Sequence, residues 1–168
     1  MTRLIAAALL AAMVLGGCGG GGDEPKTMTK ERYVAEGDLV CARLTDRFAT
    51  AGATDPQTPQ DIVQSANVLA DLYGELRKGL QDIRLPADPV ERRGAEAYVA
   101  AVRATDPTLV RLRSSAQRFA AAAGAPDKRE LAQAGVAVRA ALDAFRAAQA
   151  QADRRALDYG FNSCGNLE

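Results

Sequence analysis

Histidine and tryptophan are absent from the chain, and aromatic residues make up only 5% of its 168 residues. Histidine is the commonest general base and the commonest metal ligand in proteins. Its absence excludes Ser-His-Asp and Cys-His catalysis, histidine-ligated haem, and the Glu-x-x-His pairs of a di-iron bundle. We therefore expect no enzyme activity, no metal and no cofactor.

Neither sign of charge is in excess, because 21 lysine and arginine residues balance 21 aspartate and glutamate residues. A nucleic-acid-binding protein normally concentrates a basic excess on one face, so we expect no nucleic-acid partner. The glycine run at 19–22 follows no predicted strand, and it therefore does not indicate a phosphate-binding loop.

The N-terminus has the pattern of an export signal. An apolar run from Leu4 to Leu15 follows Arg3, and it is shorter than the roughly 20 residues that a membrane-spanning helix needs. The run ends in Leu15-Gly16-Gly17-Cys18, which resembles the bacterial lipobox. The resemblance implies that residues 1–17 are removed and that Cys18 carries a lipid. The alternative is an ordinary secretory signal followed by an incidental cysteine.

A lipid on Cys18 implies attachment to the cell membrane on its extracytoplasmic side, since two acyl chains provide stable anchoring. Residues 18–28 are rich in glycine and then in charge, so they cannot bury a core and are predicted to form a flexible tether. Residues 29–168 are predicted to form the folded domain.

Two cysteines, Cys41 and Cys164, remain after Cys18 is assigned to the lipid. Outside the cytoplasm a remaining pair is typical of a disulfide bond. Such a bond would close most of the domain into one loop, and the chain-entropy estimate of its stabilisation is ~5 kcal/mol at most. The alternative is two free, buried thiols.

Apolar residues recur along the domain at alternating steps of three and four, which predicts amphipathic helices and no strands. Start and stop signals divide the pattern into four helices. The first covers Lys30–Thr50, the second begins at the N-cap Thr58 and ends before Pro86, the third begins at the N-cap Asp88 and ends near Gly124, and the fourth begins at the N-cap Asp127 and ends at Gly160.

The positions expected to face the core follow from the same spacing. They are Val34, Gly37, Cys41, Leu44 and Phe48 in the first helix; Ile62, Ala66, Leu69, Tyr73, Leu76, Leu80 and Ile83 in the second; Tyr98, Val102, Thr105, Leu109, Leu112, Ala116, Phe119 and Ala123 in the third; and Leu131, Gly135, Val138, Leu142, Phe145, Gln149, Ala152, Ala156 and Tyr159 in the fourth.

Four amphipathic helices with short connections predict an all-α, antiparallel four-helix bundle of up-down-up-down topology. Pro107 lies inside the third helix, although the spacing of apolar residues continues through it. We predict one long helix kinked at Pro107; the alternative is two separate helices.

Two polar residues, Thr105 and Gln149, interrupt the apolar positions at about the same level of the predicted bundle. Pro107 has no N–H, so the carbonyl of Arg103 loses its helical donor at this level. We predict that the Gln149 amide satisfies this carbonyl and meets the Thr105 hydroxyl. The alternative places both side chains at the edge of the apolar stripe, bonded to water.

The overall layout resembles the small helical lipoproteins and secreted proteins that are common in actinobacteria, of which most have no assigned activity. The resemblance includes the lipobox, the polar tether, Ala- and Arg-rich helices and the closing Tyr159-Gly160…Cys164-Gly165. The sequence favours a non-catalytic interaction module with a protein partner in the cell envelope. A bundle that binds a small ligand or a lipid is the alternative.

Overall fold

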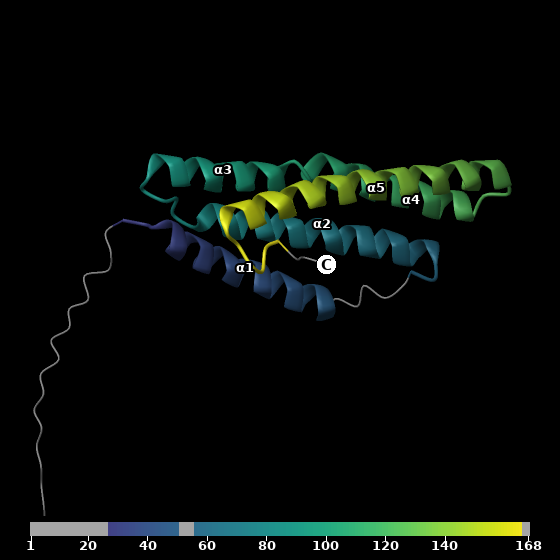
Figure 1. The fold of residues 1–168 in the computed structure, drawn as a ribbon. Helices are drawn as coiled ribbons and strands as arrows, with labels where there is room; N and C mark the ends of the chain where they lie inside the picture. Colours follow the sequence, from purple (N-terminus) through teal and green to yellow (C-terminus); the bar gives the residue numbers. More distant parts are fainter. Residues whose placement is uncertain (1–26, 51–55, 166–168) are drawn as a thin grey trace, which may run out of the picture.

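The computed structural model describes residues 27–50 and 56–165. Within these residues the chain is all-helical and contains no strand, as the sequence predicts. The helices are α1 (Lys30–Thr50), α2 (Pro59–Asp82), α3 (Pro89–Arg103), α4 (Asp106–Ala123) and α5 (Lys128–Tyr159) (Figure 1).

The predicted helix starts are confirmed by their hydrogen bonds. The Thr58 hydroxyl accepts a bond from the Asp61 N–H at 3.2 Å, and the Asp61 carboxylate accepts one from the Thr58 N–H at 2.8 Å. The Asp88 carboxylate accepts the N–H bonds of Val90 and Glu91 at the start of α3. These side chains satisfy backbone donors that have no partner inside the helix.

Both ends of α5 also follow the predicted signals. The Asp127 carboxylate accepts a bond from the Arg129 N–H at 2.8 Å, which caps the start of α5. At the other end of α5, Gly160 adopts the left-handed conformation with φ 109°. Glycine ends helices in this way because it has no Cβ to clash.

The segment expected as one kinked helix is divided into α3 and α4 by Ala104 and Thr105. The break follows from the missing N–H of Pro107, which leaves the Arg103 carbonyl without a helical donor. Hydrogen bonds between residues three positions apart form here instead. The Thr105 N–H donates to the Val102 carbonyl, and the Thr108 N–H donates to the Thr105 carbonyl. The buried positions nevertheless continue across the break without a change of register.

The helices pack side by side along their lengths (Figure 1). The last helix, α5, packs against both α3 and α4, and α2 packs against α4, α3 and α1. Met28, just before α1, already belongs to the packed domain. Its side chain is buried, and its carbonyl accepts a hydrogen bond from the Ala87 N–H at 3.0 Å. The packed domain therefore includes the last residue of the predicted tether.

The core has two parts with different side chains. The larger part contains the four tyrosines, Phe145, Phe161 and the two cysteines together with aliphatic residues. The smaller part is made of Ala66, Leu112, Ala116 and Ala141, where α2, α4 and α5 meet. The three alanines leave little side-chain bulk between these helices.

Candidate functional site

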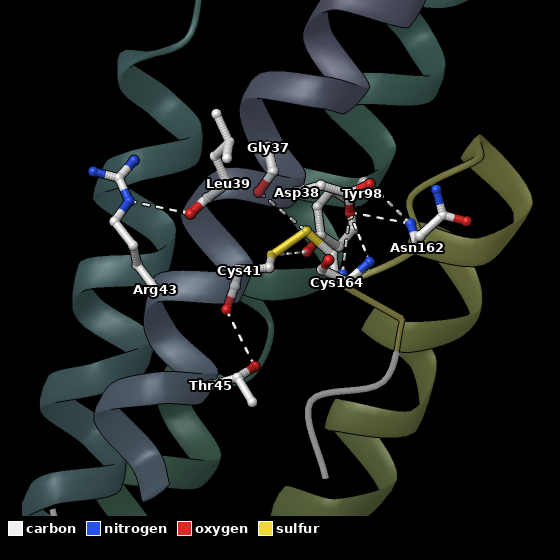
Figure 2. Close-up of a disulfide and its surroundings, with 10 residues drawn as sticks. Gly37, Asp38, Leu39, Cys41, Arg43, Thr45, Tyr98, Asn162 and Cys164 are labelled. Carbon is white, nitrogen blue, oxygen red and sulfur yellow. Dashed lines mark hydrogen bonds between the residues drawn. A yellow bond between two sulfur atoms is a disulfide. The ribbon is translucent and has the colours of Figure 1, made fainter. Parts of the chain in front are cut away.

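The predicted pairing of Cys41 with Cys164 is confirmed, and Figure 2 shows the disulfide between α1 and the segment that follows α5. The two Cα atoms lie 5.1 Å apart, and both residues are fully buried. The Tyr98 hydroxyl lies 3.8 Å from the Cys41 sulfur. Tyr98 is the donor in this contact, because a disulfide sulfur carries no hydrogen.

Asp38 fixes the same C-terminal segment by a second means (Figure 2). Its carboxylate accepts bonds from the backbone N–H groups of Asn162 at 3.0 Å and Ser163 at 2.8 Å. Phe161 is buried beside these bonds, among the rings of Tyr33, Tyr98 and Tyr159. The disulfide, the carboxylate and the ring together close this part of the bundle.

The tyrosines in this region are buried and stay neutral. Burial raises the pKa of Tyr33 to about 12. The rings of Tyr33 and Tyr159 meet edge to face, with their centroids 5.9 Å apart. Burial also raises the pKa of Tyr159 to about 12, with Glu91 adding to the effect. Within the described part of the chain, neither hydroxyl has a hydrogen-bond partner. Both phenols therefore keep their protons at neutral pH.

An open site lies elsewhere, in a hollow bounded by α1, α2 and α5, which we call the α1/α2/α5 hollow. It consists of two adjoining spaces of about 520 Å³ and about 180 Å³. Both spaces are lined by Phe48, Leu69 and Leu142, so they lie next to each other. The larger space falls within the ~300–1,000 Å³ typical of small-ligand sites.

The hollow exists because part of the predicted core is left uncovered. Several residues that the helical spacing assigns to the core are only partly buried, and five apolar ones among them line the hollow: Phe48, Ile62, Leu69, Val138 and Leu142. In α1 no residue beyond Leu44 is buried, so the last turns of this helix cover α2 and α5 incompletely. This arrangement leaves apolar surface facing solvent.

The two ends of the hollow differ in polarity. The apolar end is lined by Ile62, Val68, Leu112 and Val138, and Ser65 is the only polar residue among the described residues there. The polar end is lined by charged and amide side chains of α5, namely Arg146, Gln149 and Asp153, and by Tyr73 of α2.

Charges of both signs lie at the polar end. Arg146 is 67% exposed and lies 4.0 Å from the Asp143 carboxylate, an ion pair one turn apart on α5. Burial raises the pKa of Tyr73, and the nearby Asp153 carboxylate raises it further. Arg146 therefore offers N–H donors to the hollow, and Asp153 offers acceptor oxygens.

The residues of the predicted polar cluster occupy two different settings. Thr105 is fully buried at the break between α3 and α4, and its hydroxyl donates to the Val102 carbonyl at 2.7 Å. Gln149 is partly buried and lines the α1/α2/α5 hollow. Pro107 lies in the first turn of α4. The contact of Gln149 with Thr105 and with the Arg103 carbonyl stays a prediction.

Three further points concern the expected lipid anchor, metal binding and the membrane. Cys18, the predicted lipidation site, lies outside the described residues. In residues 27–50 and 56–165, no three Cys, Asp or Glu side chains gather closely enough to hold a metal ion. None of α1–α5 has the length and apolarity that crossing a bilayer would require, as far as the described chain goes.

Reasoning from the sequence did not find the hollow, because its apolar residues have the spacing of ordinary core positions. The one signal was Gln149, a polar residue within an apolar stripe that the structure places at the polar end of the hollow. The sequence matches no protein-family model, and it has no match among curated proteins or solved structures.

Proposed function

We propose that the chain is a lipid-anchored binding module on the extracytoplasmic side of the cell membrane, without catalytic activity. The likeness of Leu15-Gly16-Gly17-Cys18 to the lipobox supports the anchor. The absence of histidine from the sequence supports a non-catalytic role, since it removes the commonest general base. An anchored domain on a tether of about ten residues can reach partners in the envelope close to the membrane.

The observation that carries the binding role is the α1/α2/α5 hollow. Its lining brings the partly exposed apolar side chains of Phe48, Leu69 and Leu142 together, and contiguous apolar surface of this kind often marks an interaction site. The region around the disulfide, in contrast, is closed by packing. A binding module of this kind needs an exposed apolar surface with a few polar groups, and this hollow has both.

The finer architecture belongs to the same proposal. We infer that α3 and α4 act as one kinked rod, so that the chain forms an antiparallel up-down four-helix bundle. The uninterrupted buried register from Val102 to Leu112 supports a single rod. The packing of α5 along both α3 and α4 supports it as well.

Two kinds of occupant suit a binding module. An envelope protein could insert side chains into the hollow, as the sequence favours. A small ligand or a lipid is the second candidate, and the size of the hollow favours it, because the larger space of about 520 Å³ has the volume of a small-ligand site.

Photo-crosslinking in intact cells tests the binding role. A photoreactive amino acid replaces Ala150, an exposed residue that lines the hollow, in the full-length chain. The matched control places it at Ala147, which is also exposed on α5 and is not among the lining residues. We expect an adduct of defined mass at position 150 and not at position 147. Equal labelling at both positions, or none at position 150, would contradict the proposal.

A further inference from the structure

We propose that the occupant of the α1/α2/α5 hollow is a single-chain amphiphile with a zwitterionic head. This inference rests on the binding role proposed above and names its ligand class. The apolar chain lies along the floor shared by the two spaces, and the head lies at the polar end.

The lining is what such a ligand requires. A purely apolar ligand would cover Arg146 and remove water from its guanidinium without replacing the hydrogen bonds to that water, which is costly. A purely polar ligand would leave Ile62 and Val138 at the apolar end facing water. A ligand with one apolar and one polar end satisfies both parts of the site.

The charges select the head. Arg146 can donate to a phosphate, whereas the carboxylates of Asp153 and Asp143 disfavour a head with net negative charge. Arg146 and Asp153 lie about two turns, or about 10 Å, apart along α5. A head with both an anionic and a cationic group complements both side chains.

The shape favours one acyl chain over a partner helix. The apolar floor follows α2 from Ile62 to Tyr73, a length of about 16 Å at 1.5 Å per residue. A stable protein partner usually buries about 800 Å² on each side, which is more than a hollow of this size offers. The membrane to which the proposed lipid would anchor the domain is a source of such amphiphiles.

The experiment uses the full lipidated chain in phosphatidylethanolamine–phosphatidylglycerol vesicles. The vesicles contain lysophosphatidylethanolamine with a photoreactive group at the end of its chain, or a fatty acid with the same photoreactive chain. We expect the lysolipid to label the parts of α2 and α5 at the apolar end, around Ile62 and Val138. The fatty acid, whose head is anionic, should label them several-fold less.

Two matched variants identify the site. Ala150→Trp fills the hollow from its edge without removing a core side chain, and it should lower labelling about tenfold. Ala147→Trp adds the same bulk outside the hollow and should label like the unmodified chain. Asp153→Asn should narrow the preference for the lysolipid over the fatty acid, because it removes a carboxylate that disfavours the anionic head. Circular dichroism of each variant checks that the helices are intact.

The outcomes separate the ligand from the binding role. Equal labelling of the unmodified chain and Ala150→Trp would overturn the amphiphile site, and equal labelling by the two lipids would overturn the zwitterionic head. If lipid labelling fails while the photoreactive residue at position 150 captures one defined protein, the amphiphile is overturned and the binding role stands. If both experiments fail, both proposals fall.

Discussion

Phe161 packs directly on Gly37, so that a methyl group at Gly37 would overlap the Cε1 atom of the ring. The ring cannot easily move away, because it is held among Tyr33, Tyr98 and Tyr159. Glycine in the middle of a helix normally costs stability, by about 0.5–1 kcal/mol relative to alanine. At this position the missing side chain is needed to admit the C-terminal segment.

Gly37→Ala is therefore expected to destabilise the protein. Overpacking a core costs about 1–3 kcal/mol, which exceeds the gain in helix propensity. Gly74→Ala is the control, because nothing lies within 4 Å of a Cβ at that helical position. The control should gain about 0.5–1 kcal/mol. Denaturant unfolding of both variants measures the two effects, and a stabilised Gly37→Ala would refute the packing described for Phe161.

Removing the disulfide should lower the free energy of unfolding by about 2–5 kcal/mol. The bond joins residues that are 123 positions apart, and closing this loop lowers the entropy of the unfolded chain. The double variant Cys41→Ala/Cys164→Ala, compared with the oxidised chain by denaturant unfolding, gives this value. Peptide maps with and without reductant check the pairing in protein taken directly from the envelope. Alkylation of both thiols before reduction would reject the bond.

Alkaline pH should unfold the protein through its tyrosines. Burial raises the pKa of both Tyr33 and Tyr159 to about 12, whereas in the unfolded chain each hydroxyl loses its proton near pH 10. The fold therefore binds more protons than the unfolded chain above pH 10, so its stability is full below that pH and falls as the pH rises toward 12. Tyrosinate absorbance and helical circular dichroism should change together. Tyrosinate formation near pH 10 with intact helices would contradict the burial.

The polar cluster yields a prediction at the break between α3 and α4. If Gln149 satisfies the Arg103 carbonyl, Gln149→Leu should cost about 1–3 kcal/mol by leaving that carbonyl unpaired. Pro107→Ala restores an N–H for the carbonyl and should recover most of this cost in the double variant. The melting temperatures of the two single variants and the double variant test the coupling. An unchanged melting temperature in Gln149→Leu would exclude the cluster.

The helix boundaries could be predicted because they depend on local chemistry. Thr58, Asp88 and Asp127 cap helices with their own side chains, and Gly160 ends α5 because it tolerates positive φ. The disulfide could be predicted from the count of cysteines. The position of the break near Pro107 was visible, but one kinked helix and two helices have the same apolar spacing.

The candidate site could not be predicted in the same way. Spacing shows which residues share a face of a helix, and it does not show whether a neighbouring helix covers that face. Phe48, Leu69 and Leu142 have the spacing of core residues, yet the end of α1 leaves them partly exposed. The hollow forms because the neighbouring helices do not pack closely along their whole length, and this spacing is set by tertiary packing.

The most direct test of the account is the mass of the N-terminal peptide of the protein purified from the envelope. We predict a peptide that begins at Cys18 and carries a diacylglycerol thioether, with Cys18→Ala either unprocessed or released from the membrane fraction. An unmodified peptide that begins at another residue, or normal acyl labelling and membrane fractionation of Cys18→Ala, would contradict a lipid-anchored binding module.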